Sequence, residues 1–378
     1  MSGSTNAWAD RDLRVLITGG AGFIGSHLAN TLVETGYRVR VLDVLKPQVH
    51  GADPQWPAYL HPQIEKYNGD VRDREAVRKA LAGVTHVYHF AAAVGVGQSM
   101  YEIEHYTDVN NRGTAVLLEE LIRQPAQRLI VASSMSVYGE GLYRNEKALH
   151  EPQPRTREQL SRGQWDLFAG RQPLEPVATP ETKQTAPSSV YALSKLDQEQ
   201  LCLMFGAAYR VPTVALRFFN VYGPHQSLSN PYTGVLAIFA SRVLNGNAPL
   251  IFEDGLQRRD FVSVWDIAQA CRLALTTQAT GEIFNIGSGQ PRSILDIAHS
   301  VTKVLDDSLE PVVTGKYRTG DIRHCFADIS KARRLLGYEP RVIFEEGLSE
   351  LAEWLAQTTA TDNFLHAASE LDRRGLTL

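Results

Sequence analysis

The chain has 378 residues, 43% of them hydrophobic, and its 38 Lys and Arg residues against 42 Asp and Glu residues leave a formal net charge of −4. This composition is typical of a soluble globular protein with one large or two ordinary domains, and its slight acidity argues against a nucleic-acid-binding surface. No apolar run is long enough to span a bilayer, and we expect no secretion signal, because no charged segment followed by an apolar one opens the sequence.

The cysteines and the first twelve residues give no sign of a metal site or a disulfide framework. Cys202, Cys271 and Cys325 are far apart, with neither the spacing of a metal site nor that of a disulfide framework. Unpaired cysteines are typical of a reducing compartment. We therefore expect a cytoplasmic protein without a metal site and without a membrane or nucleic-acid partner. Residues 1–12 are polar and predict a flexible tail.

A glycine-rich stretch comes next. Residues 15–17 form a short apolar run that predicts a buried parallel strand, and apolar residues at helical spacing over 24–33 predict a helix. Between them, Gly19 would permit a sharp turn, Gly22 would let the backbone approach a pyrophosphate, and Gly25 would let the helix pack close to the strand. Because a helix N-terminus favours phosphate, the stretch predicts a dinucleotide site; an ordinary glycine-rich turn is the alternative.

Acidic residues follow the next two short segments. Residues 38–42 predict a second strand, and Asp43 stands at its end, 18 residues after Gly25. A carboxylate there accepts hydrogen bonds from an adenosine ribose and repels a 2′-phosphate, so Asp43 predicts NAD rather than NADP. Asp70 and Val71 would meet the adenine, unless Asp70 is only a solvated loop acid.

Strand-like and helix-like segments alternate along the chain. We predict strands at 85–91, 128–133, 211–217 and 282–287, and helices at 108–121, 190–205, 235–246, 264–277, 294–305 and 344–356. This alternation is typical of an α/β fold with a doubly wound parallel sheet, whose ligands bind beyond the carboxyl ends of the strands. Residues 140–187 are rich in proline and charge, and they predict a long surface insertion, either a lid or a disordered segment.

Tyr191 and Lys195 are four residues apart in a predicted helix and would share one face. A nearby ammonium, with the positive nicotinamide of a cofactor, would lower the pKa of the phenol from its ordinary value of about 10, and Lys195 would also hold the cofactor ribose. Ser134, after the strand 128–133, would donate to a substrate oxygen beside Tyr191. The alternatives are that Tyr191 is only structural and that the serines only cap the end of the strand. A serine hydrolase is another enzyme class to consider, but no Gly-x-Ser-x-Gly elbow occurs.

A set of motifs occurs in a fixed order along the chain. They are the glycine loop, Asp70-Val71, His89-Phe-Ala-Ala92, Ser133-Ser134, Tyr191 with Lys195, Arg217-Phe-Phe-Asn-Val-Tyr-Gly-Pro224, Arg259-Asp-Phe-Val262 and Asn285-Ile-Gly287. With this set, from about Leu13 to about Leu355, the chain resembles the extended short-chain dehydrogenase/reductases, in particular the NAD-dependent sugar-nucleotide epimerase/dehydratase family. The resemblance implies a Rossmann domain that holds NAD and a smaller C-terminal domain that holds a nucleoside-diphosphate sugar.

By this resemblance we expect a homodimer in which each chain has two domains. The NAD-binding Rossmann domain would comprise residues 13–217 and 260–288, including the insertion 140–187. The sugar-nucleotide-binding domain would comprise residues 218–259 and 289–378.

The resemblance also assigns roles to residues. Ser134 matches the catalytic Ser/Thr, Tyr191 the base and Lys195 its partner. Around NAD we expect Gly19, Gly22, Phe23, Ile24, Gly25, Asp43, Asp70, Val71, Ala91, Ala92 and Lys195. Around the substrate we expect Ser134, Ser136, Asn220, Asn230, Arg259 and Arg318. Of these, Asn220 lies near the diphosphate, and the two arginines would grip the nucleotide ribose and diphosphate, because guanidinium suits phosphate geometry.

The residues after Ser134 depart from one branch of this family. Its dehydratases carry an Asp-Glu pair directly after the catalytic Thr, where this chain has Met135 and Ser136, and a methionine cannot move a proton. More narrowly, the chain is similar to the dTDP-L-rhamnose 4-epimerase group in the segments 133–140, 229–234, 252–255 and 320–328.

We therefore predict an NAD-dependent 4-epimerase of a nucleoside-diphosphate sugar, of the dTDP-6-deoxyhexose kind such as dTDP-L-rhamnose. Tyr191 would take the proton of the C4 hydroxyl while C4 gives its hydride to NAD. The 4-keto sugar would turn over before hydride and proton return. The alternatives are an NAD(P)H-dependent 4-ketoreductase of a dTDP-4-keto-6-deoxy sugar and a non-catalytic NAD(H)-sensing protein; the presence of Ser134, Tyr191 and Lys195 argues against the second.

Overall fold

The computed structural model describes residues 13–228, 230, 232, 234–318, 320–358 and 361–377. The predicted tail, residues 1–12, lies outside the described residues, and the segment 229–234 is described only in part.

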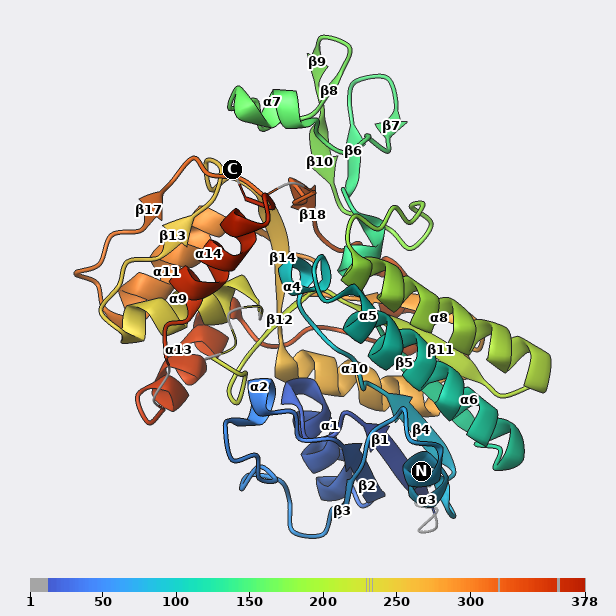
Figure 1. The fold of residues 1–378 in the computed structure, drawn as a ribbon. Coiled ribbons are helices and arrows are strands. Elements are labelled where there is room, and N and C mark those ends of the chain that lie inside the picture. The colour runs from blue at the N-terminus through green and yellow to red at the C-terminus, as the bar shows by residue number, and fades with distance from the viewer. Residues whose placement is uncertain are drawn as a thin grey trace, which may run out of the picture.

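A parallel sheet of seven strands forms the centre of the fold (Figure 1). Its order is β15-β11-β5-β4-β1-β2-β3. The strands are β1 Arg14–Thr18, β2 Arg38–Asp43, β3 Glu65–Asn68, β4 His86–His89, β5 Arg128–Ser134, β11 Thr213–Phe218 and β15 Glu282–Ile286. The predicted doubly wound sheet is confirmed, and the order reverses beside β1, where ligands of such sheets bind at the carboxyl ends of the strands.

Helices cover both faces of this sheet, because its central strands are buried and apolar on both sides. One face carries α1 Phe23–Glu34, α10 Val264–Thr276 and α12 Ser330–Leu336, and the other carries α3 Arg74–Leu81, α6 Gly113–Arg123 and α8 Val190–Tyr209. The short helices α2 Pro47–His50, α4 Val96–Ser99 and α5 Ile103–Tyr106 lie near the carboxyl ends of the strands. The predicted helix 108–121 begins as a wide π-helical turn over 107–112 and continues as α6.

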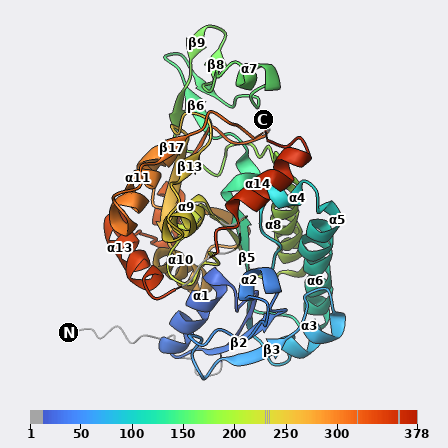
Figure 2. The ribbon, with the colours of Figure 1, turned by 60° about the vertical axis from the view of Figure 1, so that its left-hand side comes forward.

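A second, smaller lobe stands beside the carboxyl ends of the strands (Figures 1 and 2). Its core lies among α9 Val235–Leu244, α11 Ile294–Leu305 and α13 Phe344–Leu355, with β12 Asn220–Tyr222 and β14 Arg258–Ser263. The remaining elements are β13 Leu250–Ile251, β16 Pro291–Ser293, β17 Val312–Val313, β18 His324–Cys325 and α14 Phe364–Arg373. Sequence analysis does not predict α14, which lies against the cavity described below.

The insertion 140–187 is an ordered projection and not a disordered segment (Figure 1). It contains β6 Leu142–Arg144, β7 Leu149–His150, α7 Arg157–Ser161, β8 Phe168–Ala169, β9 Gln172–Pro173 and β10 Glu175–Val177. Its own core consists of Tyr143, Leu167 and Leu174, too few to hold it alone.

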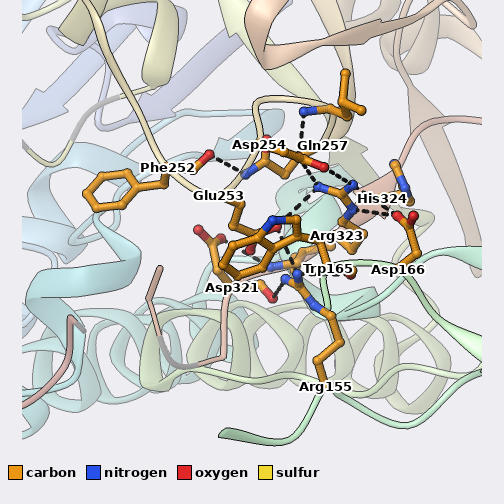
Figure 3. A network of polar contacts seen from close by, with 12 residues as sticks. Arg155, Trp165, Asp166, Phe252, Glu253, Asp254, Gln257, Asp321, Arg323 and His324 are labelled. Atoms are coloured by element: carbon orange, nitrogen blue, oxygen red, sulfur yellow. Dashed lines mark hydrogen bonds and ion pairs between the residues drawn. The ribbon is translucent and has the colours of Figure 1, made fainter. Parts of the chain in front are cut away.

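A buried ion pair between Arg155 and Glu253 and a partly exposed one between Asp166 and Arg323 tie the insertion to the second lobe (Figure 3). Arg155 Nη1 donates to Glu253 Oε2 at 2.8 Å, and its Nη2 donates to the carbonyl oxygen of Asp321 at 3.0 Å. Arg323 donates to Asp254 Oδ1 at 2.6 Å and to Asp166 Oδ1 at 2.9 Å. No described residue of 140–187 lines the cavity below, and the insertion contacts the second lobe instead; its role as a lid stays a prediction.

Removing Arg155 tests this anchor. The side chains of Arg155 and Glu253 are each 1% exposed, and burial raises the pKa of Glu253. Arg155→Met leaves this buried carboxylate with Arg323, at 3.2 Å, in place of two arginine partners. We expect a loss of about 3 kcal/mol in the free energy of unfolding, measured by denaturant titration. Adding Glu253→Gln to Arg155→Met should recover part of that loss.

The matched control is Arg144→Met in the same insertion. Its pair with Glu175 is exposed on both sides, so the change should stay within about 0.5 kcal/mol. Equal stabilities of Arg155→Met and Arg144→Met would contradict the anchoring role.

Candidate active site

A cavity of about 860 Å³ lies at the carboxyl ends of the central strands, between the sheet and the second lobe. All the predicted site residues line it: Gly19, Gly22, Phe23, Ile24, Gly25, Asp43, Asp70, Val71, Ala91, Ala92, Ser134, Ser136, Tyr191, Lys195, Asn220, Asn230, Arg259 and Arg318. The fold therefore brings together every one of these residues, and their individual roles stay predictions.

The glycine loop has the geometry that a pyrophosphate needs. Gly19 has φ +71°, and a Cβ there would lie 2.8 Å from the Ala91 nitrogen. A Cβ on Gly25 would lie 2.3 Å from the Gly19 carbonyl oxygen, so only glycine lets α1 approach the turn. Gly22 faces the cavity with a single neighbour at 3.3 Å. Since no side chain caps α1 and no acid stands in its first turn, its N–H groups are left for a phosphate.

The two acids of the cofactor end differ in how they are held. Asp43 Oδ2 accepts a hydrogen bond from the Ala21 nitrogen at 3.0 Å, and its Oδ1 accepts one from the Leu45 nitrogen at 2.9 Å. These bonds fix the carboxylate at the end of β2. Asp70 is paired with Arg72 at 2.6 Å; burial raises the pKa of Asp70, but the Arg72 hydrogen bonds outweigh it and lower that pKa.

Tyr191 and Ser134 meet at the centre of the cavity. Helix α8 begins with Ser189 as its cap, which accepts from the Ala192 nitrogen at 3.1 Å and places Tyr191 in the first turn. The Ser134 hydroxyl accepts from the Ser136 hydroxyl at 2.9 Å, and Ser134 lies near enough to Tyr191 to lower the pKa of its phenol. A hydroxyl and a phenol held together can grip one substrate oxygen.

Burial raises the pKa of Tyr191 above its ordinary value, and Ser134 offsets this only in part. The Lys195 ammonium donates to Gln198 Oε1 at 2.7 Å, and burial lowers the pKa of Lys195 to about 8. The lowering of the Tyr191 pKa that is expected with a cationic nicotinamide in the cavity stays a prediction.

Sequence analysis missed the polar network behind Lys195. Gln198 Nε2 donates to Thr114 Oγ1 at 2.9 Å, and the His89 Nε2 atom lies 2.8 Å from the same hydroxyl. Asn110 donates to Ser194 Oγ at 2.8 Å and binds both backbone polar groups of Ala93. The available signal was helical spacing, because Gln198 falls on the face of α8 that also carries Tyr191 and Lys195.

A buried ion pair fixes α8 on the sheet. Glu199 on α8 accepts from Arg217 Nε at 2.9 Å and from Arg217 Nη2 at 2.7 Å, across to β11. The Ser133 hydroxyl of β5 donates to Glu199 Oε2 at 2.6 Å. The residue before Ser134 and the helix that carries Tyr191 are thereby tied to one carboxylate.

The substrate end has three unsatisfied polar atoms. Among the described residues, Asn220 Oδ1, Gln257 Oε1 and Arg318 Nε are buried without a hydrogen-bond partner, and all three residues line the cavity. The Arg318 guanidinium lies 4.4 Å from the centre of the Phe252 ring. Arg259 is less free, because it donates to the carbonyl oxygens of Arg323 and Ile322. Buried unpaired polar atoms beside a cavity are the expected mark of a polar ligand.

Two further findings concern other classes of function. Within the described ranges, no group of three His, Cys, Asp or Glu side chains is placed to hold a metal ion. None of the helices in this part of the chain is long and apolar enough to cross a membrane.

Comparisons with known proteins agree with this geometry. Residues 15–161 and 168–287 match the model of the NAD dependent epimerase/dehydratase family. The chain is 37% identical over 350 residues to a dTDP-L-rhamnose 4-epimerase of Burkholderia thailandensis, covering 91% of this chain and 95% of that protein. It is 30% identical to a putative UDP-glucose 4-epimerase of Methanocaldococcus jannaschii, covering 92% of this chain and 100% of the relative.

A solved structure shows the same fold. The UDP-glucose 4-epimerase of Thermus thermophilus in complex with NAD matches with a TM-score of 0.73 at 30% identity, over 92% of this chain and 100% of that chain. Together with the glycine loop and the cavity, these matches confirm NAD as the cofactor. The chain belongs to the NAD-dependent epimerase/dehydratase family, and it is an NAD-dependent sugar-nucleotide epimerase.

Proposed function

We propose that this enzyme inverts the configuration at C4 of a nucleoside-diphosphate sugar, of the dTDP-6-deoxyhexose kind. The observation that carries the proposal is that Ser134 and Tyr191 line the same cavity as the glycine loop, with Lys195 beside them. A pair of this kind can hold one hydroxyl oxygen and move its proton.

Different residues of the cavity would bind the cofactor and act on the substrate. The N-terminus of α1 and Gly22 would hold the pyrophosphate of NAD, and Asp43 its adenosine ribose. NAD, when bound, supplies a centre that takes a hydride from the sugar carbon and gives it back. Ser134 donates a hydrogen bond to the O4 oxygen and keeps it beside Tyr191. Tyr191 takes the proton of the C4 hydroxyl and returns it to O4 after the sugar has turned over in the cavity.

The residues beside this pair favour epimerisation over loss of water. Met135 and Ser136 stand where the related dehydratases carry two acids, and Met135 is buried with no group that can transfer a proton. The dTDP-L-rhamnose 4-epimerase relative supports a dTDP-linked 6-deoxy sugar. A cytoplasmic homodimer remains part of the proposal; the three buried, unpaired cysteines are consistent with that compartment.

The direct test is turnover without a reductant. Purified enzyme loaded with NAD should invert C4 of dTDP-L-rhamnose when no hydride donor is added, and a panel of dTDP- and UDP-sugars would rank its substrates. A strict need for added NADH or NADPH with a 4-keto sugar would instead identify a 4-ketoreductase.

Tyr191→Phe tests the proton transfer. The ring still packs in the variant, so folding and NAD binding should persist, while turnover per folded, NAD-loaded subunit should fall about a hundred- to ten-thousand-fold. Tyr209→Phe, on the exposed end of the same helix, should keep full activity. If Tyr191→Phe retains more than about a tenth of wild-type turnover, the assignment of the base is wrong.

Asp43→Asn tests cofactor choice. The wild type should bind NAD more tightly than NADP, because the fixed carboxylate repels a 2′-phosphate. In Asp43→Asn the neutral amide should bring the dissociation constant for NADP closer to that for NAD, and calorimetry measures both constants. A wild type that binds NADP as tightly as NAD would disprove the role of Asp43.

Arg318→Ala tests the diphosphate contact. Loss of a charge-assisted hydrogen bond should raise the substrate KM by about ten- to a hundredfold, since such a bond contributes about 1.5–3 kcal/mol. The melting temperature should stay close to that of Arg334→Ala, a change of an exposed arginine on α12. A large fall in melting temperature with an unchanged KM would mean that Arg318 serves the fold.

A further inference from the structure

The C-terminal segment 361–377 crosses the cavity from the second lobe to the loop after β4. In Figure 2, α14 lies beside α4, and the two helices come from opposite ends of the chain. This proximity is direct, because a Cβ on Gly97 of α4 would lie 3.4 Å from the Leu371 side chain. Helix α14 therefore spans both parts of the molecule over the cavity.

Polar and aromatic contacts hold the first end of this segment on the second lobe. Asp362 pairs with Arg242 at 3.1 Å and accepts from Asn247 Nδ2 at 3.2 Å. The Phe364 ring lies 5.1 Å from the Arg242 guanidinium and 6.3 Å from the Phe252 ring. The start of α14 is thus fixed beside Phe252, whose ring also carries the Arg318 guanidinium.

The other end is held on the opposite side of the cavity. The Arg374 guanidinium lies 4.2 Å from the centre of the Tyr101 ring, just after α4. The chain then returns to pair Thr377 with Arg318 as an antiparallel bridge. With both ends attached, α14 presents one defined face to the cavity.

That face is apolar along its whole length. The α14 residues that line the cavity are Phe364, Ala367, Ala368 and Leu371, and the loop after β4 contributes Val94, Val96, Gly97 and Met100. We call these eight residues the apolar wall. Gln98 of the same loop also lines the cavity, but its amide is already bonded to Gln48, Glu102 and Tyr106. The eight side chains of the wall have no hydrogen-bonding group of ordinary strength, so a polar substituent that packs against them loses its bonds to water without replacement.

The wall lies next to the proposed reaction centre. A Cβ on Gly95, in the middle of the loop, would lie 2.8 Å from the Tyr106 hydroxyl. The Tyr106 ring in turn packs edge-to-face on the Tyr191 ring, with centroids 6.4 Å apart. The loop half of the wall thus borders the phenol that would act at C4. In a hexose, C6 is carried by C5, the carbon bonded to C4, so we expect C6 of a sugar held at Tyr191 to lie close to this wall.

We propose that the apolar wall selects the sugar by its C6 substituent, accepting a methyl group and disfavouring a hydroxymethyl or carboxylate group. This inference rests on the proposed C4 epimerisation. Burying a methyl group against Leu371 is favourable, whereas a hydroxyl there stays unpaired. Residues 288–377 lie outside the segments that match the family model, so the α14 half of the wall is no part of that match.

The test compares dTDP-L-rhamnose with dTDP-L-mannose, which differ only by the hydroxyl on C6. For the wild type we expect kcat/KM to favour the 6-deoxy sugar by about ten- to a hundredfold, the range that apolar pockets achieve against an added hydroxyl. Leu371→Asn places an amide on the wall and should lower this ratio about tenfold, because one hydrogen bond contributes about 1 kcal/mol or more. The matched control, Leu365→Asn on the outer face of α14, should leave the ratio unchanged, since Leu365 is 63% exposed.

Two further measurements keep the outcomes distinct. Ala368→Ser makes a smaller polar change on the same face and should shift the ratio in the same direction if Leu371→Asn fails to fold. Dissociation constants of both sugars with NAD-loaded enzyme should show the same preference without any turnover. If the enzyme prefers the 6-deoxy sugar in binding but does not invert C4, the proposed function is wrong and the selective role of the apolar wall stands. If it inverts C4 with equal kcat/KM for the two sugars, or with a ratio that neither wall variant changes, the selective role of the wall is wrong and the proposed function stands.

Discussion

The buried ion pair between Glu199 and Arg217 sets the register between the helix that carries Tyr191 and the strands that end at Ser134. Its carboxylate accepts from β11 and from Ser133 of β5, so a shift of α8 by one turn would leave a charge unpaired inside the protein. Breaking such a buried pair costs about 3–5 kcal/mol. The ion pair therefore maintains the distance between the Tyr191 phenol and the Ser134 hydroxyl. It acts through Ser133, the residue before Ser134, and through Glu199, which lies two helical turns after Tyr191.

The polar groups of the cavity form two regions with different tasks. Around the glycine loop, the backbone itself makes the contacts, and Asp43 is held by backbone N–H groups. Around Asn220 and Arg318, side-chain atoms are buried without partners in the described structure. The first region is complete before any ligand arrives. The second is left with unsatisfied groups that a charged nucleotide can satisfy, which makes substrate binding there favourable.

The sequence predicted best what depends on neighbours in the chain. Three local patterns are the glycine spacing, the apolar strands and the spacing of Tyr191 and Lys195. In the structure the residues of all three lie around one cavity or form the sheet beneath it. Strand β3 was missed because Glu65–Asn68 is a polar edge strand with no apolar alternation. Helix α14 and the anchor of the insertion depend on distant partners: Arg155 and Glu253 are 98 residues apart. The rise in the pKa of Tyr191 comes from burial, which the sequence does not show, and the lowering expected with bound nicotinamide stays a prediction.

The position of β15 at the edge of the sheet has a consequence for biosynthesis. Strand β15, Glu282–Ile286, pairs with β11, and α10 packs against α1. The sheet and the helix layer on one of its faces are therefore completed by segments that come late in the chain. At about 5–20 residues per second, a ribosome needs roughly 10 to 50 s to pass from β1 to β15. During that interval the side of α1 that later packs against α10 stays uncovered, so the contact that completes this face of the sheet forms only after most of the chain has been made.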